Sequence, residues 1–158
     1  MIDDCFQHLF NREPSKSVII GANKQKSFYE DLVQIGTKDD TGVGAPDAEV
    51  AVACLKEYME GFQKRNPNLY VFNAVMHLDE AMPLLHINYI PVGHYDRGLD
   101  IRNAMAKALE EMNFGHDSRA INRWRLKVWA VLSNICAEHG IDISEPQKSR
   151  GYSYTVEE

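Results

Sequence analysis

The chain has 158 residues, 44% of them hydrophobic, which suffices to bury the core of one domain without disulfides or a structural metal. Its net charge of −6 disfavours a surface that grips nucleic acid everywhere, and three scattered cysteines exclude a disulfide framework or a Cys-based zinc site. No apolar run approaches the roughly 18 residues of a membrane span, and the acidic start excludes a basic secretory signal, so we expect a cytoplasmic protein with no membrane partner.

The first half of the chain predicts a helix, a strand and a second helix. Apolar positions 2, 6, 9 and 10 favour a short helix over residues 2–10. Residues 28–35 indicate a strand that stops at Gly36, and a loop rich in turn formers follows up to Pro46. From Asp47, apolar residues recur every three or four positions as far as Asn66, which predicts an amphipathic helix.

The second half predicts two strands and two helices. Residues 69–78 and 84–92 are rich in Val, Ile, Tyr and Phe, and their short link requires an antiparallel pair. Helical periodicity returns from Ile101 to Met112 and again from Ile121 to Gly140, with Trp124 on the apolar face. We therefore predict an α+β fold, an antiparallel sheet with helices packed against it, in one domain over residues 1–143 with a polar, flexible tail over 144–158.

Two histidines and two acids gather at the link between the predicted strands. On a strand, His77 and Asp79 share a face, and His86 lies on the neighbouring strand. If the register sets His77 against His86, two imidazoles meet with Asp79 and Glu80 nearby, a set that suits zinc, manganese or iron. Spacing alone leaves a plainer alternative open, in which both histidines are hydrogen-bonded residues of a core.

Residues 77–91, HLDEAMPLLHINYIP, resemble the His-x-Asp-Glu-x-Thr-Pro-His-x-His signature of the Pre/Mob (MobV) relaxases, which mobilise and recombine plasmids. Residues 28–36, 38–42, 57–67 and 69–75 are also similar to that family, so the resemblance covers most of the chain. It implies a relaxase-like His-hydrophobic-His endonuclease fold, in which three histidines hold a divalent metal, manganese or magnesium, over the scissile phosphate. The partner would be single-stranded or origin-of-transfer DNA, cleaved by transesterification.

The resemblance assigns roles to several residues. His77 and His86 match the first and last metal ligands, and Glu80 matches the signature acid that orients or activates a nucleophile, with Asp79 beside it as the other catalytic candidate. The middle histidine of the signature falls on Leu84, whose side chain cannot bind a metal. We therefore expect a weakened metal site, completed at best by Asp79 or Glu80 as a carboxylate ligand.

The nucleophile is not identifiable. No segment before Phe28 matches the His-x-x-Arg type of motif, and no tyrosine has a context that selects it. The chain is therefore expected to be either a piece of a longer protein or a degenerate copy, and whether it is an active enzyme stays open.

Basic residues gather in the second half of the chain. Residues 97–127 hold seven Lys and Arg against four acids, whereas residues 1–60 hold six against eleven. We predict that DNA is contacted by six of the basic residues, some of them in the tail: Arg97, Arg102, Arg119, Arg123, Lys148 and Arg150. The alternative is an ordinary solvated helix face.

The sequence thus favours a plasmid mobilisation or recombination relaxase domain that binds origin DNA and performs, or has lost, metal-dependent nicking. Two alternatives remain: a catalytically degenerate DNA-binding module, and a metal-dependent phosphoesterase of another class.

Overall fold

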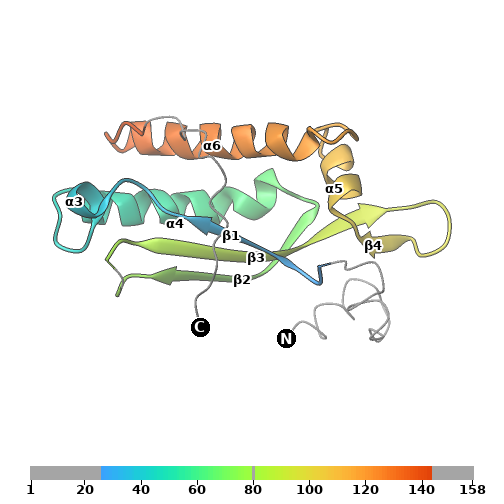
Figure 1. The fold of residues 1–158 in the computed structure, drawn as a ribbon, viewed down its shortest axis with the longest axis horizontal. Helices are drawn as coiled ribbons and strands as arrows, with labels where there is room; N and C mark the ends of the chain where they lie inside the picture. The colour runs from blue at the N-terminus through green and yellow to red at the C-terminus, as the bar shows by residue number, and fades with distance from the viewer. Residues whose placement is uncertain (1–25, 80, 144–158) are drawn as a thin grey trace.

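The computed structural model describes residues 26–79 and 81–143 of the chain. Its elements, labelled as in Figure 1, are β1 (Tyr29–Val33), α3 (Lys38–Thr41), α4 (Ala48–Arg65), β2 (Leu69–His77), β3 (Leu84–His94), β4 (Ile101–Asn103), α5 (Met105–Glu111) and α6 (Ala120–Glu138). The helix expected over residues 2–10 and the tail expected over 144–158 lie outside the described residues.

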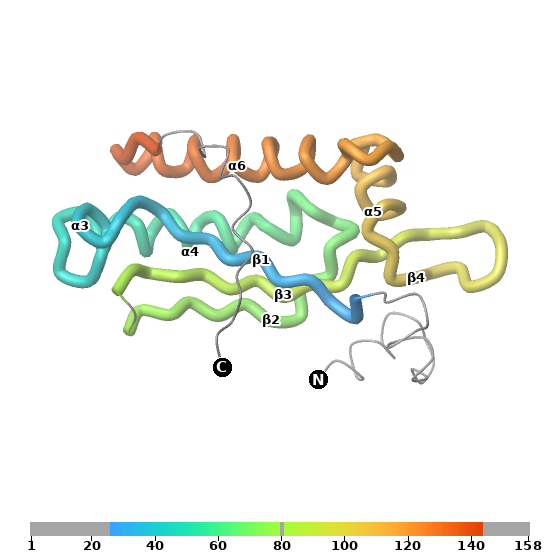
Figure 2. The backbone as a smooth tube through the Cα atoms, viewed as in Figure 1, coloured from blue at the N-terminus to red at the C-terminus, as the bar shows by residue number. Residues whose placement is uncertain are grey.

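The strands form one antiparallel sheet in which β3 is central. The order is β1-β3-β2, and β4 pairs with the far end of β3. Tyr29 of β1 lies opposite Tyr89 of β3, so segments sixty residues apart in sequence run side by side, as the backbone trace shows (Figure 2). The brief link between β2 and β3 produces the antiparallel pair that the sequence predicts.

The long helices α4 and α6 lie on the same side of the sheet (Figure 1). Tyr89 points toward them, because its ring centroid lies 6.0 Å from that of Phe62 in α4 and 6.4 Å from that of Trp124 in α6. Trp124 is 3% exposed and donates its indole N–H to Asn66 Oδ1 at 2.8 Å, so the predicted core position of this residue is confirmed. Buried Cys54 and Cys136 are free thiols at the contact between the two helices.

One acid lies on the helix-facing side of β1. The phenolic O–H of Tyr89 donates to Asp31 Oδ1 at 3.4 Å. Burial raises the pKa of Asp31 above its ordinary value, although the Tyr89 hydrogen bond and the charge of Arg125 oppose this shift. Burial also raises the pKa of Tyr89, and the nearby Asp31 carboxylate raises it further.

The residues that alternate with the core positions of β3 point away from the helices. His86 and Asn88 lie between the core residues Leu85, Ile87 and Tyr89, so they belong to the other face of the sheet. We call this second surface the open face, since neither α4 nor α6 packs on it. Candidate functional residues from all three long strands meet there.

The predicted fold class, an α+β antiparallel sheet with helices packed against it, is confirmed, but two local predictions were wrong. Ile101 was assigned to a helix, yet it forms β4 and pairs with His94, and α5 begins only at Met105. Three residues are too short a strand to show an alternating pattern. The loop predicted after Gly36 contains the one-turn helix α3, capped by Thr37 and Asp40. Among the described residues, no helix is long and apolar enough to cross a membrane.

Candidate metal centre

The two signature histidines lie in contact on the open face. Their ring centroids are 4.8 Å apart and the rings meet edge to face at 74°. The register differs from the one considered from the sequence: His77 lies opposite Leu84, and His86 lies opposite Val75. The histidines are therefore diagonal neighbours, and long side chains reach across such a diagonal.

Leu84 takes the third corner of a triangle with these histidines. It lies directly across from His77 and two residues from His86 on the same strand, so all three side chains belong to the open face. Leu84 is 8% exposed and has no atom that can donate electrons to a metal. Within the described ranges, no three His, Cys, Asp or Glu side chains form a group that could hold a metal ion. The residues that the structure describes thus place two imidazoles side by side, without a third side chain beside them that could bind a metal.

Of the two acids predicted to lie beside the histidines, Asp79 and Glu80, the structure describes only Asp79, and Asp79 makes no hydrogen bond to them. Asp79 follows β2, and its Oδ1 lies 3.9 Å from Nδ1 of His77, beyond hydrogen-bond distance. The Asp79 side chain is 88% exposed, so solvent screens its charge. Glu80 lies outside the described residues.

A third acid, which the sequence did not single out, lies beside His86. Glu30 of β1 places Oε1 at 3.6 Å from Nδ1 of His86, while its Oε2 accepts a hydrogen bond from Asn88 Nδ2 at 2.8 Å. Asn88 in turn accepts from Asn73 Nδ2 at 3.0 Å. A chain of polar contacts therefore crosses the sheet from β2 to β1 and ends at the histidine pair. Glu30 could have been identified from the alternation of side chains along β1, which puts it on the same face as His86. That alternation is informative only once the pairing of β1 with β3 is known.

The loop that carries the signature acids is held by a neighbouring turn. Val43 donates its backbone N–H to the carbonyl oxygen of Ala81 at 3.2 Å. Gly42 allows this approach, because a Cβ at that position would meet the carbonyl oxygen of Lys38 at 2.2 Å and that of Ala81 at 2.9 Å. The turn from Thr37 to Val43 thus holds the connection between β2 and β3 through this hydrogen bond.

The arginines predicted to contact DNA are not gathered around the histidines. Arg97 and Arg102 belong to the β3–β4 hairpin, at the opposite end of the sheet from the β2–β3 connection (Figure 2). Arg119 and Arg123 lie at the start of α6, on the helix-covered side.

Two of these arginines also have partners within the chain. Arg102 donates to the carbonyl oxygens of Arg97 and Leu99, and Arg123 bonds Asp117 at 2.7 Å. Lys148 and Arg150 lie outside the described residues, so their predicted role stays a prediction.

The family model described as plasmid recombination enzyme matches residues 21–120, which include β1, the Thr37–Val43 turn and the whole histidine signature. No curated protein and no solved structure matches the chain at a significant level. Because the family model covers more than half of the sequence and includes the histidine pair on the open face, the chain belongs to the plasmid recombination enzyme family.

Proposed function

We propose that this chain binds plasmid DNA on its open face and that its metal-dependent strand cleavage is weakened or lost. The observation that carries the proposal is the contact between His77 and His86 beside a leucine at the third corner. Two imidazoles on one surface provide half of a four-coordinate site, and the third ligand position carries a hydrocarbon. We infer that the chain keeps the scaffold of a nicking centre without its full set of ligands.

A divalent metal, manganese or magnesium, would be held by ring nitrogens of His77 and His86, with water or an acid of the β2–β3 connection filling the remaining positions. When bound, such an ion supplies Lewis acidity to a phosphodiester. The Glu30 carboxylate lies 3.6 Å from Nδ1 of His86, and its negative charge would favour the tautomer that carries the proton on Nδ1 and leaves Nε2 free to act as a ligand. With one ligand missing, the binding should be weak and the cleavage slow.

DNA recognition on the open face would depend on bases more than on phosphates. None of β1, β2 and β3 contains a Lys or Arg residue, so the strands offer no cations to the phosphate backbone. β2 instead carries Phe72, whose ring meets edge to face that of Phe28, the residue just before β1, with centroids 5.6 Å apart, and the exposed side chains of Leu32 in β1 and Val75 in β2 lie on the strands as well. Aromatic and apolar groups of this kind stack on unpaired bases, so single-stranded DNA fits this surface better than a duplex.

Calorimetric titration with Mn²⁺ tests the metal centre. We expect weak binding to the natural chain, no binding to His86→Ala, and binding at least tenfold tighter for Leu84→His, which restores the third ligand. The control is Leu78→His, which adds a histidine at an exposed position immediately after β2 and outside the triangle. If Leu84→His binds Mn²⁺ no more tightly than Leu78→His, the three positions do not form a metal centre.

Fluorescence anisotropy with labelled single-stranded DNA of random sequence, and with the same DNA annealed to its complement, tests the second half of the proposal. We expect preferential binding of the single strand, loss of affinity in Phe72→Ala, and a modest response to salt. Binding that is equal for single and double strands and unaffected by Phe72→Ala would place the DNA elsewhere on the molecule. No DNA binding by the natural chain would overturn this part of the proposal while leaving the metal titration informative.

A further inference from the structure

Two buried thiols face each other between the long helices. Cys54 of α4 and Cys136 of α6 are free, each is 0% exposed, and the two side chains hydrogen-bond to one another. The helices are antiparallel: Asn66, just after α4, accepts the indole N–H of Trp124 near the start of α6. Cys54 and Cys136 each lie twelve residues from that contact, so the register that joins Asn66 to Trp124 also brings the thiols together.

A hydrogen-bonded ion pair joins the same two helices beside the thiols. His139, three residues after Cys136, places its Nε2 at 2.6 Å from Oε2 of Glu57, three residues after Cys54. Both side chains of this pair are partly exposed, so solvent reaches the ion pair although it does not reach the thiols. The ion pair holds the end of α6 against α4.

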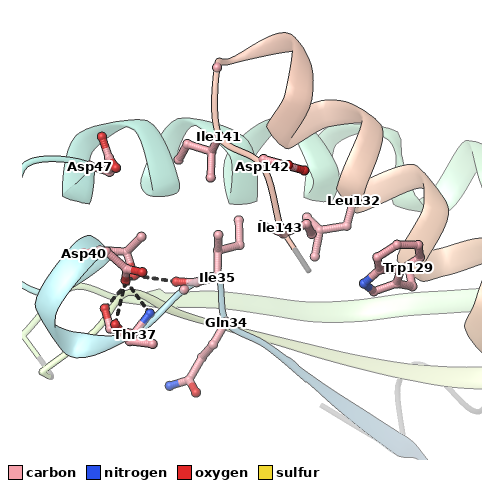
Figure 3. Close-up of a pocket in the computed structure, with 13 residues that line it drawn as sticks. Gln34, Ile35, Thr37, Asp40, Asp47, Trp129, Leu132, Ile141, Asp142 and Ile143 are labelled. Atoms are coloured by element: carbon pink, nitrogen blue, oxygen red, sulfur yellow. Dashed lines mark hydrogen bonds between the residues drawn. The ribbon is translucent and has the colours of Figure 1, made fainter. Parts of the chain in front are cut away.

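A cavity of about 530 Å³ runs along the end of α6. Two of its lining residues, Leu132 and Gly140, lie one helical turn before and one turn after Cys136. Trp129 and Ile141 line the same space, and Figure 3 shows both with Leu132 around it. Because Gly140 is exposed, the cavity brings solvent to within about one turn of a thiol that is itself buried.

From this arrangement we infer that Cys54 and Cys136 form an intramolecular disulfide when the protein meets a hydroperoxide, and that this bond locks α4 to α6. Thiols that already touch need little backbone movement to form a disulfide. With hydrogen peroxide, one thiolate attacks an oxygen, the O–O bond breaks, and a sulfenic acid and water result. The second thiol then attacks that sulfur, and the S–O bond breaks to release a second water. The two sulfurs lose the two electrons that the peroxide gains, and both thiol protons end in water.

Burial keeps the pair reduced until the end of α6 loosens. It raises the pKa of the Cys54 thiol and raises the pKa of Cys136 to about 12, so both thiols stay protonated at neutral pH. Because the thiolate is the reactive form, oxidation requires an opening that hydrates Cys136. The bond between His139 and Glu57 opposes this opening, so its loss should speed the oxidation.

The disulfide would close a long loop that contains β2 and β3, the strands of the histidine pair. A cross-link around such a loop restricts the unfolded chain, so the oxidised protein should unfold at a higher urea concentration than the reduced protein. This inference concerns the helical layer and does not depend on metal or DNA binding at the open face.

Mass spectrometry of the full chain after treatment with hydrogen peroxide tests the bond. Cys5→Ser is used as the background, so that only Cys54 and Cys136 remain as thiols. We expect the monomer to yield a peptide pair linked through these two residues, which dithiothreitol separates, and a higher urea midpoint after oxidation. The matched control is Cys54→Ala in the same background, which should give neither the linked peptides nor the shift.

The rate of disulfide formation tests the role of the ion pair. His139→Ala should form the disulfide up to about fivefold faster, as the loss of a partly exposed ion pair allows. His116→Ala removes an exposed histidine from the connection between α5 and α6 and should keep the original rate.

Three outcomes would overturn the inference. The first is the absence of linked peptides after a treatment that fully oxidises free glutathione. The second is a link that forms only in urea, and the third is an equal urea midpoint for oxidised and reduced protein. Equal rates in His139→Ala and His116→Ala would overturn the part assigned to the ion pair.

Discussion

At the scale of single residues, one acid of the open face lies beside a histidine and hydrogen-bonds to a neighbouring asparagine. Glu30 contacts His86 with one carboxylate oxygen and Asn88 with the other, so its charge and its hydrogen bond serve different neighbours. These two roles can be separated by a substitution that keeps the shape and removes the charge.

We predict that Glu30→Gln alters the tautomer of His86 without unfolding the protein. A glutamine can still accept the hydrogen bond from Asn88, but it lacks the negative charge that favours a proton on Nδ1. Nitrogen-15 chemical shifts of the His86 ring report the two tautomers, and Mn²⁺ affinity should fall by about 10- to 100-fold, as is usual for such outer partners. The control is Glu49→Gln, at an exposed position of α4. An unchanged tautomer ratio would show that Glu30 does not orient His86.

At the scale of elements, the Thr37–Val43 turn is a brace for the signature loop. Its function depends on the absence of a side chain at Gly42, whose φ of −66° is open to any residue. The requirement for glycine is therefore one of space and not of backbone conformation: two carbonyl oxygens occupy the position where a Cβ would lie.

We predict that Gly42→Ala destabilises the fold by roughly 1–3 kcal/mol, the usual cost of forcing an extra carbon into a packed site. The turn must move away from Ala81, so the amide of Val43 should exchange its hydrogen faster, while amides of central β3 such as Ile87 stay protected until global unfolding. Gly140→Ala is the matched control, because it meets no atom within 4 Å and suffers only from its φ of 84°. Equal Val43 exchange in the two variants would contradict the brace.

At the scale of the whole molecule, Asp31 makes the stability depend on pH. Its folded pKa is raised above the ordinary 3.8 by burial, so the folded protein holds this proton more tightly than the unfolded chain. Stability from this group is complete below pH 3.8 and is lost as pH rises through the raised pKa. Hydrogen bonds from Arg123 and from the backbone of Arg119 lower the pKa of Asp117. The stability that Asp117 contributes is therefore present at higher pH and is lost as the pH falls through its lowered pKa.

We therefore predict that Asp31→Asn is more stable than the natural chain at neutral pH and nearly equal to it below pH 3.8. The asparagine can still accept the hydrogen bond from Tyr89 but cannot ionise. Urea unfolding between pH 3.5 and 7.5 gives the difference in free energy of unfolding between the two proteins, which should grow with pH and then level off. Asp39→Asn, on the exposed surface of α3, should show no such trend, and a pH-independent difference for Asp31→Asn would refute the assignment.

Much of this molecule follows from local patterns in the sequence. The amphipathic period from Asp47 to Asn66 predicts α4, and the period beyond Ile121 predicts α6 and the buried position of Trp124. The short link after His77 requires an antiparallel pair of strands, so the proximity of His77 and His86 was predictable, whereas their shared face depended on a register that the sequence left open. Each of these inferences depends on neighbours within a few turns or one hairpin, where periodicity and chain length leave few options.

Other features were decided only by the tertiary structure. The diagonal placement of the histidines depends on a bulge between Val71 and Asn73, and the role of Glu30 depends on pairing across nearly sixty residues. The cavity beside Trp129 is formed by segments that no periodicity relates. The sequence alone determined the long helices α4 and α6, the antiparallel hairpin, and the presence of a leucine at position 84 where the resembled signature has a histidine, because these depend on residue type and local spacing. The register of the strands, the polar chain to Glu30 and the cavity required the fold, because contacts between distant segments are set by how the whole core packs.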